Sequence, residues 1–188
     1  TKNINLFYKI IIASIPLGII GLFLIKYGII QNLRTFEVMG WTTILFGILL
    51  YLSDKFQVNK KFEKNLSIKN VLIIGIFQIL AVIPGVSRSG IIITSARFLK
   101  FNRIDSAKIS FLLSIPALGF WSIYGFYDLI KQNDNILNTS ALLTGLLSFV
   151  FSYLTIKYFL VYLKRFNLNL FVIYRLIFGI MLLLIAYL

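Results

Sequence analysis

The sequence contains no cysteine and no histidine, and each absence removes a class of chemistry. Without cysteine there are no disulfides, no thiolate catalysis and no cysteine-rich metal sites. Without histidine the chain lacks the usual proton-transfer group at neutral pH and the commonest ligand for transition metals. Catalysis must therefore depend on other side chains, or on groups outside this chain.

Acidic residues are also scarce, six against nineteen basic ones, for a net charge of +13. The basic residues are spread over several segments instead of lining one face, so we expect no nucleic-acid partner. The acids fall in predicted loops or at the ends of apolar segments, and we expect no metal site within this chain. They are Glu37, Asp54, Glu63, Asp105, Asp128 and Asp134.

Long apolar runs dominate the rest, with 59% hydrophobic residues, 13% charged residues and a mean hydropathy of +0.91. Several runs approach the roughly 20 residues that cross a bilayer as a helix. They do not alternate as barrel strands would. The sequence predicts an all-α polytopic membrane protein with about five transmembrane helices, at residues 6–25, 36–52, 109–130, 141–163 and 168–188.

Two shorter apolar runs, 71–83 and 91–99, flank a Pro-Gly break and are too short to span. We predict a re-entrant helix-loop-helix over residues 71–99. If it turns back without crossing, fourteen basic residues lie on the cytoplasmic side and three on the other, as the positive-inside rule favours. A single crossing would remove most of this bias.

The organisation predicted is a single membrane domain over residues 1–188. Ser14-Ile15-Pro16 recurs as Ser114-Ile115-Pro116, which is a weak sign of inverted repeats. We assign 1–53 to the remainder of a first repeat, 54–70 to a basic cytoplasmic loop and 71–188 to a second repeat. Because the chain begins without Met, we expect an N-terminal truncation, with a first re-entrant motif upstream of Thr1.

The loop between the two short runs carries the chemistry. Arg88 lies at predicted membrane depth, where a guanidinium costs at least about 2.5 to 3.5 kcal/mol and faces a partner or a wet cavity. Its planar donors match phosphate oxygens. Ser87 and Ser89 add hydroxyls. The helix breakers Pro84, Gly85 and Gly90 let backbone N–H groups approach an anion at a helix N-terminus.

Three further polar residues lie in apolar context. For Gln78, a helix-packing hydrogen bond and a role in the site are equally open. For Arg175, we favour a structural ion pair or a snorkelling side chain over phosphate binding. For Thr94, as for Ser95, we expect a hydrogen bond to the helix backbone, with a site role as the alternative.

The loop Pro84-Gly85-Val86-Ser87-Arg88-Ser89-Gly90 resembles the second signature motif of bacterial undecaprenyl pyrophosphate phosphatases. The family's first motif, a Glu-rich stretch with a serine cluster and a His, is absent from this chain. Ile92 stands where the family usually has a Thr. The resemblance extends to Ile15-Pro16 and Gly21, Gly75-Ile76-Phe77-Gln78, Ser110-Phe111-Leu112-Leu113-Ser114-Ile115-Pro116, Tyr174-Arg175 and Gly179.

The resemblance implies a multi-pass enzyme of the bacterial inner membrane, with two inverted repeats around a cleft that faces the periplasm. It would hydrolyse undecaprenyl pyrophosphate, a polyprenyl pyrophosphate lipid, to undecaprenyl phosphate and inorganic phosphate. This recycles a carrier for cell-wall synthesis and is linked to bacitracin resistance. Arg88 would grip the pyrophosphate, assisted by Ser87 and Ser89.

The resemblance also implies a divalent cation, Mg²⁺ or Ca²⁺, with its ligands in the missing N-terminal part, so we expect this chain alone to be inactive. A homodimer stays open. Two other functions are open as well. A lipid-phosphate carrier or flippase would use the same broken helices without cleavage. In a structural membrane subunit, Arg88 would only pair with a carboxylate of another helix.

Overall fold

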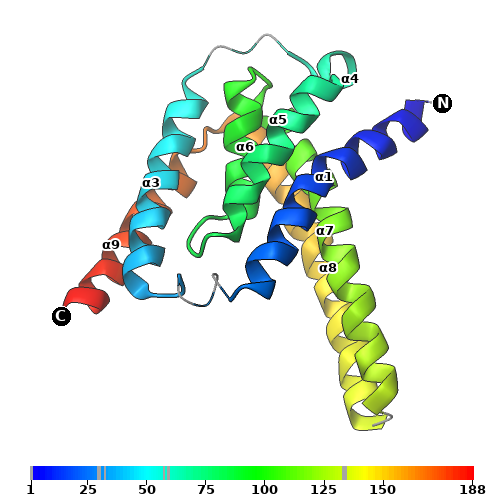
Figure 1. The fold of residues 1–188 in the computed structure, drawn as a ribbon. Helices are drawn as coiled ribbons and strands as arrows, with labels where there is room; N and C mark the ends of the chain where they lie inside the picture. Colours follow the sequence, from blue (N-terminus) through cyan, green and yellow to red (C-terminus); the bar gives the residue numbers. More distant parts are fainter. Residues whose placement is uncertain (1, 29–30, 32, 57, 59, 133–134) are drawn as a thin grey trace.

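The computed structural model describes residues 2–28, 31, 33–56, 58, 60–132 and 135–188. Within these ranges the chain is helical and has no β-strand (Figure 1), which confirms the predicted all-α class. The elements are α1 (Lys2–Lys26), α3 (Phe36–Asp54), α4 (Phe62–Asn65), α5 (Ile68–Ile79), the 3₁₀ turn η1 (Leu80–Val82), α6 (Arg88–Phe98), α7 (Arg103–Gln132), α8 (Asn135–Arg165) and α9 (Asn169–Tyr187).

Four segments of the described helices are long and apolar enough to cross a membrane. They are Ile4–Leu24, Phe36–Asp54, Ser140–Arg165 and Asn169–Tyr187. The fifth predicted span, residues 109–130, lies inside the continuous 30-residue helix α7 but is not among these four. The chain is thus a polytopic membrane protein.

Five of the observed helices, α1, α3, α6, α7 and α8, are longer than the apolar runs that predicted them, because helical hydrogen bonding continues into polar residues at the ends. The predicted loop 54–70 shows the same effect at both of its borders, where the prediction is corrected. Asp54 is the last residue of α3, and α5 already begins at Ile68. Ser67 caps α5 by accepting a hydrogen bond from Asn70 N at 3.2 Å.

The hairpin of α5 and α6 has the predicted shape. Its helices of 12 and 11 residues are about 18 and 17 Å long, roughly half of the hydrocarbon thickness. They pack against each other and are joined by the Pro84 loop at one end (Figure 1). At the other end Lys60 N donates to Lys100 O at 3.1 Å, so the chain enters and leaves the hairpin on the same side.

The carboxylate of Asp54 joins several helix ends on that side. It accepts from Arg103 at both oxygens, with Nε to Oδ1 at 2.7 Å and Nη2 to Oδ2 at 2.9 Å. Arg97 Nε lies 3.3 Å from Oδ1, and Leu168 N donates to Oδ2 at 3.3 Å. The ends of α3 and α6 and the starts of α7 and α9 therefore meet at one carboxyl group.

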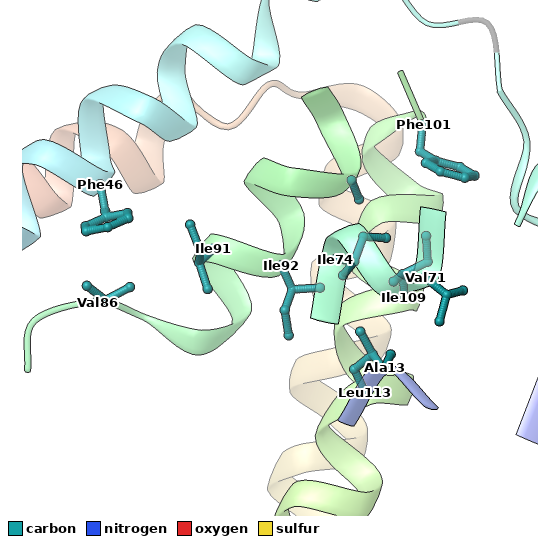
Figure 2. Close-up of a cluster of buried hydrophobic side chains, with 11 residues drawn as sticks. Ala13, Phe46, Val71, Ile74, Val86, Ile91, Ile92, Phe101, Ile109 and Leu113 are labelled. Atoms are coloured by element: carbon teal, nitrogen blue, oxygen red, sulfur yellow. The ribbon is translucent and has the colours of Figure 1, made fainter. Parts of the chain in front are cut away.

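A hydrophobic cluster packs the hairpin against its neighbours (Figure 2). Phe46 of α3 lies over Val86 and Ile91, and Ile74 lies beside Ile92. Ile92 is fully buried in this cluster. The residue that departs from the family pattern therefore fills the core instead of facing the loop.

Two helix pairs approach so closely that they exclude side chains at the contact. In the α3–α9 pair, a Cβ on Gly179 would lie 3.0 Å from Gly40 O. In the α1–α5 pair, a Cβ on Gly75 would collide with the carbonyl oxygen of Ala13. Such close approach is how helices associate in lipid, where the hydrophobic effect does not drive them together.

Gly75→Ala tests the second contact. The added methyl group meets backbone, which cannot rotate away, so we expect overpacking to cost about 1–3 kcal/mol and to lower the melting temperature of the purified protein in detergent. Gly145→Ala on α8 is the control, because a Cβ there meets nothing within 4 Å. Equal melting temperatures of Gly75→Ala and wild type would contradict the observed α1–α5 packing.

Candidate functional site

The Pro84 loop is held by hydroxyl groups of α3. Thr43 Oγ1 donates to Gly85 O at 3.2 Å, and Thr42 Oγ1 lies 2.6 Å from Pro84 O. Thr42 is twelve residues before Asp54, about 18 Å along the helix axis, so the loop lies well inside the predicted membrane thickness. Both loop carbonyls thus accept hydrogen bonds from hydroxyl groups of α3, which fixes the loop against this helix.

Gly85 is required at this turn for two reasons. Its φ is +89°, a left-handed backbone conformation that residues with a side chain rarely adopt. A Cβ would also collide with Thr42 Oγ1 and lie 2.6 Å from Met39 O. The loop can therefore approach α3 only with glycine at this position.

The second half of the motif forms the first turn of α6, which starts at Arg88 and not at Ile91 as the apolar run suggested. Ser87 is the N-cap, and its Oγ accepts from Gly90 N at 3.2 Å. Ser89 Oγ lies 3.2 Å from Ser87 Oγ. Two hydroxyl groups thus lie at a helix N-terminus, where backbone N–H groups and the helix dipole favour an anion.

Arg175 of α9 reaches this helix start. Its Nη2 donates to Gly85 O at 3.3 Å, and its Nη1 has no hydrogen-bond partner among the described residues although it is buried. A Cβ on Gly90 would lie 3.3 Å from Nη1, so the guanidinium lies against the first turn of α6. Gly47 of α3 gives α9 room to approach here.

The expectation for Arg175 is therefore corrected. No described carboxylate pairs with it, and its 8% exposure is that of a buried side chain, not of a snorkelling one. The guanidinium instead faces the motif, because α9 packs along α3 and carries residue 175 to the level of the loop.

Ser87, Ser89, Gly90 and Arg175 line a cavity of about 540 Å³. Thr43, Gly85 and Val86 also line it. Its other wall is aromatic and comes from three helices, with Phe111 of α7, Phe159 of α8, and Phe171, Tyr174 and Phe178 of α9. The lining of the cavity thus combines hydroxyl groups and a guanidinium with aromatic side chains.

Arg88 lies beside this cavity but is not among the residues that line it. It is half-buried at the first position of α6, and no ion pair with a described carboxylate holds it there. The structure therefore brings five of the predicted residues together at the cavity, Gly85, Ser87, Ser89, Gly90 and Arg175, and the guanidinium that lines it belongs to Arg175.

The remaining candidates lie outside the cavity. Thr94 is buried and donates to Gly90 O at 2.8 Å, which confirms the predicted backbone hydrogen bond. Ser95 donates to Ile92 O at 2.9 Å in the same manner. Gln78 is fully buried, and neither atom of its amide has a hydrogen-bond partner among the described residues, so the expected packing hydrogen bond is not seen there and a role in the site stays a prediction.

A divalent cation does not fit the side chains of this cavity taken alone. Mg²⁺ and Ca²⁺ prefer carboxylate and other oxygen ligands, whereas the described lining offers hydroxyl groups and a guanidinium. Within the described residues no three acids gather into a metal site. We derive no step through a metal.

The whole sequence was compared with known proteins. Residues 1–181 match the family described as "Bacitracin resistance protein BacA". The chain belongs to this BacA family. The match covers both helices of the hairpin, the loop and Arg175, so the cavity is built from family sequence throughout.

Relatives in the BacA family carry the name undecaprenyl-diphosphatase. The chain is 49% identical to that of Pelagibacter ubique, over 99% of this chain and 73% of the relative. It is 36% identical to that of Jannaschia sp., over 100% of this chain and 70% of the relative. It is 41% identical to that of Campylobacter curvus, over 96% of this chain and 68% of the relative. These names do not favour the alternative function of a lipid-phosphate carrier or flippase. The first family motif, expected upstream of Thr1, stays a prediction.

Sequence reasoning missed Thr42 and Thr43 in this BacA-family chain. Their signal was weak, because two adjacent threonines in an apolar helix usually bond to their own backbone. Thr42 Oγ1 does lie 2.7 Å from Val38 O as well. Only the packing of α3 against the loop shows that both hydroxyl groups also face the Pro84 and Gly85 carbonyls.

Because the chain has no cysteine, a single introduced thiol reports exposure without background. Ser89→Cys places the thiol in the cavity, and we expect a polar maleimide to label it in detergent. Ser95→Cys, on the same helix but 1% exposed, should stay unlabelled until the protein is denatured. Equal protection of both thiols would contradict an open cavity at the motif.

Proposed function

We propose that this protein hydrolyses undecaprenyl diphosphate, releasing undecaprenyl phosphate and inorganic phosphate. The single observation that carries the proposal is the mixed lining of the cavity. It combines the polar groups of Ser87, Ser89 and Arg175 with aromatic side chains. A diphosphate attached to a polyprenyl chain likewise has a charged part and an apolar part. The name of the relatives agrees with this substrate.

Binding of the diphosphate would use the first turn of α6. Its leading backbone N–H groups have no partner within the helix and suit phosphate oxygens. Arg175 Nη1, buried and unpartnered among the described residues, would donate a charge-assisted hydrogen bond. Arg88, at the start of the same helix, adds a second positive charge.

Hydrolysis breaks the bond between the terminal phosphorus and the bridging oxygen, and negative charge grows on the leaving lipid phosphate. Positive groups already in place stabilise that charge without reorganisation. Arg175 is held by the Gly85 carbonyl at 3.3 Å and by packing on α3, so its position is set before substrate binds.

The aromatic wall would receive only the first part of the lipid. A volume of about 540 Å³ is that of an ordinary small-molecule site, which spans about 300–1,000 Å³. A long polyprenyl chain must therefore continue into the bilayer. Phe111 and Phe159 pack edge to face at 5.8 Å between centroids and form a firm surface for the branched chain.

We further propose an inner-membrane location with the cavity facing the periplasm. Support comes from charge: fourteen of the nineteen basic residues fall on the side assigned to the cytoplasm, where the Asp54 cluster lies. The Mg²⁺ or Ca²⁺ requirement, with ligands outside this chain, and a homodimer remain proposals from the resemblance.

Substitution of the two arginines tests the substrate assignment. In the protein with any upstream residues of its gene, we expect Arg88→Ala and Arg175→Gln each to lower kcat/KM at least about tenfold, since each removes a charged hydrogen-bond donor near the diphosphate. Phosphate release from undecaprenyl diphosphate in detergent measures this. Arg34→Gln, an exposed loop residue, is the control. Near-wild-type hydrolysis by both variants would refute the assignment.

Thr43→Val tests whether α3 positions the loop. Valine has nearly the same shape as threonine but lacks the hydroxyl group that donates to Gly85 O. From the loss of this one hydrogen bond we expect kcat to fall about two- to tenfold, with little change in KM. Thr43→Ser keeps the hydroxyl group and should restore the rate. Thr144→Val, on an exposed face of α8, controls for loss of a threonine. Failure of serine to rescue would assign Thr43 a packing role only.

A further inference from the structure

A second cleft, of about 640 Å³, lies at the end of the molecule where α3 and α8 end and α7 begins. It has no lining residue in common with the cavity at the Pro84 loop. Its floor is the Asp54 cluster, and Lys108 and Lys164 stand at its side. Neither the motif nor the proposed hydrolysis uses it.

The cleft carries an excess of positive charge. At its floor two guanidinium groups, Arg97 and Arg103, share the single carboxylate of Asp54, and Arg97 is only 2% exposed. Lys108 lies 3.8 Å from Asp105, whose carboxylate already accepts from Asn102 Nδ2 at 2.7 Å. With Lys164, four basic residues face two acids. A partly buried surplus of two positive charges favours a bound anion.

The cleft is also lined by apolar side chains, and these favour one class of anion. They are Phe56, Val58, Ile104 and Leu163. Inorganic phosphate gains nothing from such side chains, whereas a phospholipid presents a phosphodiester followed by glycerol and acyl carbons. The cleft also lies at the ends of membrane-spanning helices, which is the depth of lipid headgroups.

We propose that this cleft binds the headgroup of an anionic phospholipid of the adjoining leaflet. The phosphodiester lies among Arg103, Lys108 and Lys164, and the first acyl carbons lie against Ile104 and Leu163. The lipid supplies the negative charge that Asp54 alone does not, and it joins α7 to α8 at this end. The site is independent of the proposed hydrolysis.

Thermal unfolding in lipid nanodiscs tests this site. We expect phosphatidylglycerol, added to phosphatidylcholine nanodiscs, to raise the melting temperature of the wild type by about 2–4 °C. Lys108→Gln/Lys164→Gln should lose most of this shift. Lys61→Gln/Lys69→Gln removes the same charge from exposed positions outside the cleft and should keep it. Melting in phosphatidylcholine alone shows that each variant folds.

Two results would overturn the proposal. The first is that phosphatidylglycerol changes the melting temperature of both double variants equally, either as much as in the wild type or not at all. The basic surface would then attract anionic lipid in general, without a specific site in the cleft. Stabilisation of the wild type in phosphatidylcholine nanodiscs by inorganic phosphate, to the same extent as by phosphatidylglycerol, would mean that the cleft recognises any phosphate and not a lipid.

Discussion

The arrangement of this membrane protein depends on one carboxylate. Asp54 is the last residue of α3, accepts from Nε and Nη2 of Arg103 at the start of α7, pairs with Arg97 near the end of α6, and accepts from Leu168 N before α9. Removal of one partner from a buried ion pair typically costs about 3–5 kcal/mol, because a charge is left without compensation. With this end of the bundle held in register, the Pro84 loop reaches the level of Thr42 and Thr43 at the other end of the hairpin.

The site then follows from the register of α3 and α9. The close approach of Gly40 to Gly179 and of Gly47 to Arg175 lets the two helices lie backbone to backbone. This contact places the guanidinium of Arg175, on α9, beside the first turn of α6. The candidate site is therefore built by three segments that are far apart in the sequence, and only one of them bears the recognisable motif.

Local patterns in the sequence were enough to predict the helical class, the short hairpin and the loop, because each depends on run length, Pro-Gly breaks and charge placement within a few residues. The favoured reading of Arg175 as an ion-paired or snorkelling residue does not agree with its burial against α3, which lies more than a hundred positions away, and phosphate binding stays a prediction. Asp54 was seen only as an acid at a span end, since its partners Arg97 and Arg103 join it through tertiary packing. The signal of Thr43 was weak, and its contact with Gly85 O likewise depends on tertiary packing.

The left-handed turn at Gly85 also limits how sequences can be exchanged within the family. Its backbone lies so close to α3 that Met39 O and Thr42 Oγ1 occupy the space of a side chain. A chimera that takes the loop from one relative and α3 from another must preserve this steric match. Residues 39–43 and 84–90 must therefore be exchanged together, although forty positions separate them along the chain.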